Sequence, residues 1–191
     1  MERSRLVIAR TFLVPLVLLA VSGCSSGSDR SSAQSGSSSS PPVVTTTTAV
    51  TTANAAEEAV KTAYLAYWAM VDRLFIAPNP DDPEIELRVT EPGLRDIRNV
   101  VARRRAAGDT LSIPSAEFDK HDVTAIEIAG TTADVHDCFV DGRVSLRGDG
   151  TRDDSVVLKA VHTTMVLASS VWKVASVATT AQQSGATTCV D

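Results

Sequence analysis

The hydrophobic periodicity of the chain changes at Pro114. Before this proline, apolar residues recur every three to four positions, which is the period of an amphipathic helix. After it, apolar and polar residues alternate in segments rich in β-branched amino acids, which is typical of strands with one covered face. Helices in the first half and antiparallel strands in the second half predict an α+β fold, with the helices packed on one sheet.

The strongest helical pattern starts at Asn54, which forms a capping box with Glu57, and ends near Phe75. At 100° per residue, its large apolar side chains fall within one arc of about 120°, whereas Asp72 lies outside this arc. The arc predicts the buried face of the helix, although an aromatic stripe would also suit a ligand pocket. Its members are Val60, Tyr64, Tyr67, Trp68, Val71, Leu74 and Phe75.

The prolines at 78, 80 and 83 end this helix, and Asp82 followed by Pro83 predicts the start of a short helical turn. A second full helix is expected between Thr90 and Gly108. Its predicted inward side chains are Leu94, Ile97 and Val101, together with the aliphatic stem of Arg104.

Five strands are expected after Pro114, and short turns join them. The first two are joined at Gly130-Thr131, and Ser169-Ser170 joins the last two. The predicted strands are 123–128, 132–140, 144–147, 155–167 and 171–179.

The N-terminus predicts export. Three arginines precede an apolar run that ends at Val21, and this run is shorter than the roughly 20 residues that cross a bilayer. The sequence Val21-Ser22-Gly23-Cys24 resembles the lipobox of bacterial lipoproteins. The resemblance implies cleavage after Gly23, acylation of Cys24, and a protein held on the extracytoplasmic face of the cell membrane. An ordinary secretory signal with a cysteine at its end is the alternative.

The expected organisation is a signal peptide at 1–23, a lipidated and disordered tether at 24–54, and one folded domain at 55–191. The tether contains almost no large apolar side chains to offset the entropy of ordering it. The formal net charge of −5 argues against nucleic acid as a partner, because such binding depends on neutralising phosphates. The excess of arginine over lysine is typical of an actinobacterial genome.

Cysteine and histidine usage limits the chemistry of the site. Cys138 and Cys189 form an even pair in a chain expected to be exported, which predicts a disulfide. Two free thiols or a metal pair are the alternatives. The three histidines do not cluster with these cysteines in the sequence, so no metal or cofactor is expected.

Several details of residues 55–191 resemble small actinobacterial proteins of the NTF2-like and SnoaL-like superfamily. These details are the aromatic helix segment 63–68, the pair Asp137-Cys138, the segment Val171-Trp172-Lys173-Val174 and the terminal Cys189. The resemblance implies a cone, in which a curved antiparallel sheet wraps the first helix around a cavity. Different members use that cavity for small apolar ligands or for partner proteins.

The main hypothesis for function is a non-catalytic domain that binds a small apolar ligand or an envelope protein. The second is an enzyme related to ketosteroid isomerase or scytalone dehydratase, whose relatives place acids and bases inside the cone. Candidates for these roles are Tyr64, Asp137 and His162, and also His136, although its alternation with Asp137 predicts exposure to solvent. The third is an accessory module that forms a homodimer through its sheet.

Overall fold

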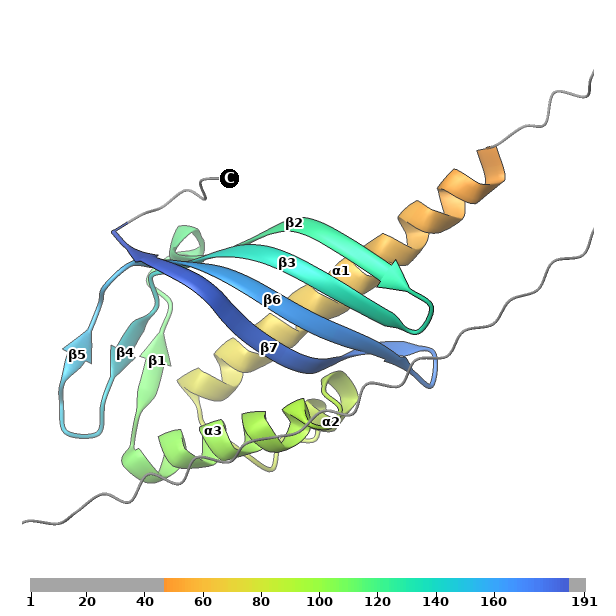
Figure 1. The fold of residues 1–191 in the computed structure, drawn as a ribbon. Helices are drawn as coiled ribbons and strands as arrows, with labels where there is room; N and C mark the ends of the chain where they lie inside the picture. Colours follow the sequence, from red (N-terminus) through yellow and green to blue (C-terminus); the bar gives the residue numbers. More distant parts are fainter. Residues whose placement is uncertain (1–46, 186–191) are drawn as a thin grey trace, which may run out of the picture. The chain divides into compact units, whose positions relative to one another are not determined.

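The computed structural model describes residues 47–185 of the chain. The predicted signal peptide, Cys24, most of the tether and Cys189 lie outside these residues. Within them, the fold is α+β, as the change of periodicity at Pro114 predicts: three helices pack against antiparallel strands (Figure 1). None of these helices is both long enough and apolar enough to span a membrane.

The long helix α1 (Thr47–Ile76) begins before the predicted start at Asn54, which is therefore wrong. No proline or glycine lies between Thr47 and Asn54, so the backbone can continue the helix through the capping residue. The helix ends before Pro78. Its predicted apolar arc is confirmed, because five of these side chains are buried and Trp68 and Phe75 are partly buried against them.

Two further helices follow the prolines. The helix α2 (Glu84–Arg88) begins one residue after the predicted first position, so Pro83 and not Asp82 occupies the cap position. The N–H of Glu84 still donates to Asp82 Oδ1 at 2.9 Å. The helix α3 (Gly93–Ala107) ends at Gly108, whose φ of 73° closes the last turn in the left-handed conformation. Ile97 and Val101 of α3 are buried as predicted.

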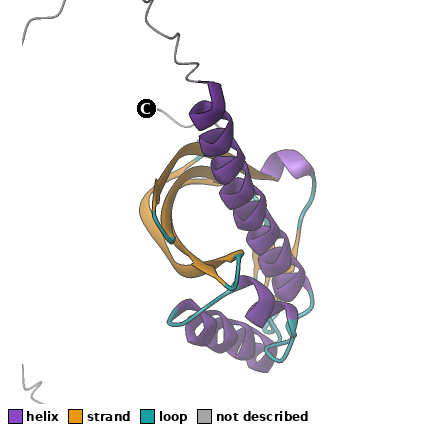
Figure 2. Cartoon of the chain, turned by 90° about the vertical axis from the view of Figure 1, so that its right-hand side faces the viewer, coloured by secondary structure: helices purple, strands orange, loops and turns teal. Residues whose placement is uncertain are grey.

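A four-stranded antiparallel sheet has the order β2-β3-β6-β7. Its strands are β2 (Asp119–Ala129), β3 (Thr132–Asp141), β6 (Val157–Ala168) and β7 (Val171–Ser184). The predicted turns are confirmed: Gly130 and both Ser169 and Ser170 have positive φ, as tight hairpins require. In Figure 2 the sheet curves, with α1 across its concave face and α3 beside its open edge.

A smaller antiparallel sheet lies next to the C-terminal end of α3 (Figure 1). It has the order β1-β4-β5 and consists of β1 (Thr110–Ser112), β4 (Val144–Leu146) and β5 (Arg152–Asp153). A 3-10 turn at Ala116–Phe118 leads from β1 into β2. The main core lies between the concave face of the large sheet and the three helices.

Candidate functional site

Inward-facing side chains of α1 and β3 meet in pairs, because the helix and the strand advance by similar distances between these residues. Four residues of a helix advance about 6 Å, and two residues of a strand advance nearly the same distance. Tyr64 and Trp68 on α1 therefore meet two successive inward positions of β3, and Asp72, one turn further along α1, meets an arginine of the loop after this strand. Tyr64 contacts Asp137, Trp68 contacts Phe139, and Asp72 contacts Arg143.

Tyr64, Asp137 and His121 form a buried hydrogen-bonded cluster. The Tyr64 hydroxyl donates to Asp137 Oδ2 at 2.7 Å, and His121 Nδ1 lies 2.6 Å from the same oxygen. The Asp137 side chain is 0% exposed, and that of His121 is 7% exposed. Burial raises the pKa of Tyr64 far above its usual value, and the nearby Asp137 carboxylate raises it further. Tyr64 therefore remains a hydrogen-bond donor at neutral pH.

His121 of this cluster also belongs to a group of stacked rings with Phe139 and Trp68. His121 stacks on Phe139 with ring centroids 4.1 Å apart and on Trp68 with centroids 4.7 Å apart. His121 Nε2 and Asp137 Oδ1 are buried without a hydrogen-bond partner among residues 47–185. The cluster thus has the residue types of acid-base chemistry, but the indole of Trp68 covers one face of its His121 ring.

A network of charges surrounds Arg143, whose side chain is only 7% exposed. Its guanidinium donates to Asp72 at 2.6 Å and to both oxygens of Asp141, and it lies over the Phe139 ring. Lys159 also donates to Asp141. Burial alone would raise the pKa of Asp141, but Arg143 and Lys159 hold it below its usual range. Asp72 lies outside the apolar arc of α1 and is nevertheless buried, because this ion pair compensates its burial.

Among the carboxylates of this network, Asp119 is the one whose buried negative charge is least compensated by Arg143. Its nearest approach to Arg143 is 3.9 Å, and its Oδ1 has no hydrogen-bond partner among the described residues. Burial raises the pKa of Asp119 to about 6, and the proximity of Asp72 contributes to the rise. The folded state therefore binds a proton at Asp119 more tightly than the unfolded state does.

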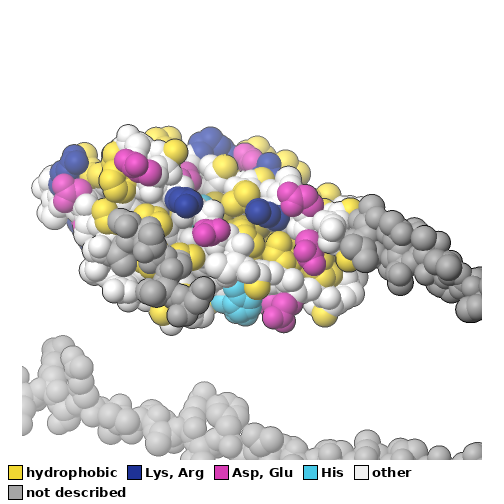
Figure 3. All heavy atoms as spheres, turned by 90° about the horizontal axis from the view of Figure 1, so that it is seen from above, with side chains coloured by type: hydrophobic (Ala, Val, Ile, Leu, Met, Phe, Trp, Pro, Cys, Tyr) yellow, Lys and Arg dark blue, Asp and Glu magenta, His cyan; other side chains and the backbone are white. Residues whose placement is uncertain are grey.

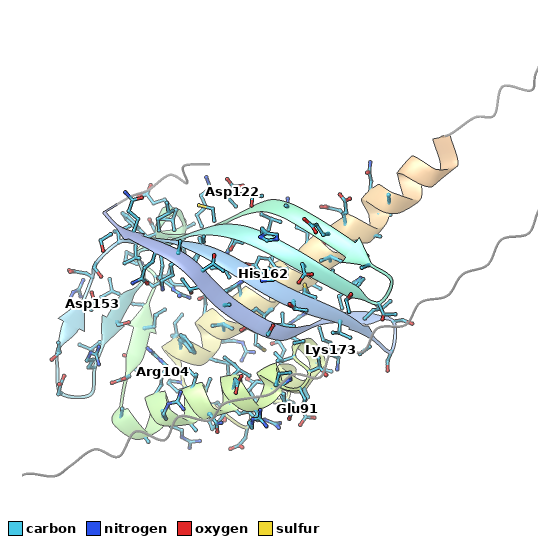
Figure 4. The ribbon with its side chains drawn as sticks, viewed as in Figure 1. Glu91, Arg104, Asp122, Asp153, His162 and Lys173 are labelled. Atoms are coloured by element: carbon cyan, nitrogen blue, oxygen red, sulfur yellow. The ribbon has the colours of Figure 1, made fainter. Side chains whose placement is uncertain are left out.

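We expect Asp119→Asn to stabilise the domain at pH 8 by on the order of 2 kcal/mol and to have little effect near pH 4. The reason is that wild-type stability linked to Asp119 is present below its unfolded pKa and is lost as the pH rises through about 6. Urea unfolding at both pH values measures the difference. Asp122→Asn is the control, since Asp122 is exposed on the same strand (Figure 4). A stability difference that is equal at both pH values would contradict the assignment.

A cavity of about 320 Å³ lies between α1, α3 and β7. Its walls are mostly apolar, and its ionisable lining residues among those described are Asp96, Arg143 and Tyr67. Trp68 also lines it, and the indole Nε1 is buried without a hydrogen-bond partner among residues 47–185. The apolar walls come from Val71, Phe75, Val89, Ile97, Val100, Val174 and Val177.

The structure brings together only part of the predicted acid-base set. Tyr64 and Asp137 are bonded in the interior, whereas His136 is exposed and stacks on His162 on the opposite, convex face. His162 Nε2 contacts Asp134 there at 3.0 Å. Figure 3 shows histidine exposed on the surface seen from above. His162 therefore does not join Tyr64 and Asp137 in one site.

His121 was not predicted as a partner of Asp137. The predicted strand starts at Val123, but β2 begins at Asp119. The two-residue period that turns Val123 toward the core also turns His121 inward. Extending the alternation by two residues before Val123 predicts His121 as an inward residue.

Cys138 is buried on the convex face of β3, in a small cluster with Val140 and Leu158. Its predicted partner Cys189 lies outside the described residues, so the disulfide remains a prediction. The same holds for acylation of Cys24.

No protein-family model matches the chain, and no curated protein matches its sequence. Among solved structures, the chain is similar to the intermembrane space region of chloroplast protein ARC6. The TM-score is 0.50, the identity is 13%, and the match covers 62% of this chain and 92% of that one. At this identity the likeness concerns the fold alone.

Proposed function

We propose that this domain binds a small apolar ligand in the cavity between α1, α3 and β7. The observation that carries the proposal is an apolar space of about 320 Å³ in a domain of this size. Ligand sites are concave, mainly apolar and furnished with a few polar groups that fix orientation. Tyr67 and Asp96 are polar groups of this kind, because both line the cavity.

A binding role without catalysis accounts best for the position of the ionisable groups. Tyr64, Asp137 and His121 do not line this cavity, and the Trp68 ring lies between His121 and the space. Arg143 reaches the wall, but its donors are occupied by Asp72 and Asp141. An acid or base must lie within hydrogen-bond reach of the substrate proton, and the Tyr64 cluster does not meet this condition here.

The proposed cellular setting follows from the N-terminal sequence. Acylation of Cys24 would hold the domain at the extracytoplasmic face of the cell membrane, where apolar ligands are concentrated. The curved sheet around α1 is consistent with an NTF2-like cone of the kind found in actinobacterial proteins. A partner protein of the envelope remains the alternative occupant of the same groove.

We expect Val177→Phe to weaken binding of octan-1-ol at least tenfold, because the ring would occupy the cavity that Val177 lines. The measurement is quenching of Trp68 fluorescence in a Trp172→Phe background, which removes the other tryptophan. Val171→Phe is the matched control, since Val171 is exposed on the same strand and does not line the cavity. Equal quenching in both variants, or no saturable quenching in the parent, would rule out this site.

A further inference from the structure

A second cavity, of about 270 Å³, lies between the C-terminal part of α1, α3 and the small sheet. In contrast to the apolar cavity, its walls carry charged side chains and the hydroxyls of Ser145 and Ser155. Arg104 of α3 lines it from one side, and the acidic residue of β5, Asp153, from another. Figure 4 labels both residues and shows that they come from different parts of the fold.

Arg104 packs on an aromatic ring and forms no ion pair with any residue between 47 and 185. Its guanidinium lies over the Phe75 ring with 4.5 Å to the centroid, which confirms the expected inward stem. Its Nε and Nη2 atoms are both buried and have no hydrogen-bond partner among residues 47–185. These two nitrogens share one edge of the guanidinium, which is the fork that matches a carboxylate or phosphate with two parallel hydrogen bonds.

The other charges at this cavity are already satisfied. Arg143 and Lys159 both donate to Asp141. Asp153 accepts from the backbone N–H and the hydroxyl of Ser155, at 3.1 and 2.7 Å. Among the described cations that line this cavity, Arg104 is therefore the one whose buried N–H groups lack hydrogen-bond acceptors.

The nearest acidic groups do not supply the missing acceptor. Asp109 follows α3, and its carboxylate accepts from the backbone N–H of Gly148 at 3.1 Å. Its contact with Arg104 is between backbone groups, because the Asp109 N–H donates to the Arg104 carbonyl oxygen at 2.9 Å. Burial lowers the pKa of Arg104, and Asp109 only partly opposes this effect. A buried guanidinium edge without acceptors is costly, so its retention calls for an explanation.

We propose that the Nε and Nη2 edge of Arg104 binds the oxyanion of a ligand in this cavity. Ser145 lies at the same wall and can donate a further hydrogen bond. An adjoining cavity of about 120 Å³ is also lined by Arg104 and Ser145, and it adds the positive charge of Arg147. A carboxylate or a phosphate group would provide the two acceptors that the fork lacks.

The oxyanion can be a small free ion or part of a larger ligand, because this cavity adjoins the apolar one. Phe75 and Arg143 line both this cavity and the apolar one, so the two spaces are neighbours. The anion is then either a small free ion or the head group of an amphipathic molecule whose chain enters the apolar cavity. The site at Arg104 does not depend on the apolar cavity being used.

The experiment is a calorimetric titration of the full chain, produced with Cys24→Ser so that it carries no acyl group. The probes are inorganic phosphate, acetate, octanoate and octan-1-ol. We expect saturable binding of at least one of the three anions, lost in Arg104→Met and at least tenfold weaker in Arg104→Lys, which keeps the charge but not the fork. Arg105→Met, an exposed neighbour on the same helix, should bind as the parent does.

The outcomes separate the two sources and the two proposals. Octanoate binding that is weakened by both Arg104→Met and Val177→Phe identifies an amphipathic ligand. Phosphate or acetate binding that depends on Arg104 but not on Val177 identifies a small anion. Failure of octan-1-ol to bind while an anion binds would contradict the apolar proposal alone. No saturable binding of any anion, or undiminished binding by folded Arg104→Met and Arg104→Lys, would overturn the oxyanion site.

Discussion

Replacing Arg143 by methionine is expected to lower the free energy of unfolding by about 3–5 kcal/mol at pH 7. Methionine retains much of the apolar stem but leaves Asp72 without its ion-pair partner and Asp141 with Lys159 alone. The side chains of Asp72 and Asp141 are 12% and 14% exposed, so water cannot fully replace the guanidinium. Urea denaturation followed by circular dichroism measures the change.

The matched control for this variant is Arg147→Met, because Arg147 is exposed and has no ion pair among the described residues. Its expected effect is within about 0.5 kcal/mol. Because Arg143 helps to hold the pKa of Asp141 below its usual range, the cost of Arg143→Met should also shrink at acidic pH, where protonation of Asp141 removes this ion pair. A loss below about 1 kcal/mol at pH 7 would show that the network is solvated and does not hold the fold.

Replacing Asp137 by alanine is expected to lower the free energy of unfolding by about 3 kcal/mol. The change removes the shared acceptor of Tyr64 and His121 and leaves two polar groups buried without partners, each at a cost of roughly 1–3 kcal/mol. Thermal and urea unfolding both report this loss. Asp137→Asn should cost less, because its amide oxygen can still accept the Tyr64 hydroxyl.

Asp134→Ala provides the comparison on the convex face. Asp134 also contacts a histidine, His162, but its side chain is 45% exposed, so the expected loss is below about 1 kcal/mol. If both alanine variants lost the same stability, the buried cluster would have no special structural role. If Asp137→Ala retained its stability, the hydrogen bonds of Asp137 would not serve the fold, and this result would favour an acid-base function for Tyr64 and His121.

The fold could be predicted from local patterns because they agree with one another. The apolar arc of α1, the stop at Pro78 and the alternation after Pro114 depend on neighbours within a few residues. The turns at Gly130 and Ser169-Ser170 follow from the backbone geometry that short hairpins require. The start of α1 was misplaced because Asn54 suits a cap but does not prevent a helix from passing through it.

The site could be predicted only in part, because its contacts join residues far apart in the sequence. Tyr64 and Asp137 were both candidates, yet no local signal shows that they bond across the domain. Asp72 was placed outside the apolar arc, and helical periodicity cannot reveal that an arginine from the loop after β3 pairs with it. The unpaired edge of Arg104 and both cavities depend on how α3 packs beside α1, which only the folded arrangement determines.

Tyr64 and Trp68 on α1 meet Asp137 and Phe139 on β3 because four helix residues and two strand residues advance by similar distances. This spacing restricts where the sequence can gain or lose residues over evolution. Inserting one residue between Tyr64 and Asp72 would rotate the following part of α1 by about 100° and turn Asp72 away from Arg143. Inserting one residue between Asp137 and Asp141 would move the second carboxylate to the other face of the sheet. We therefore expect homologues to vary these segments by substitution, and to place insertions and deletions in the β4–β5 hairpin and in the loop between α1 and α2.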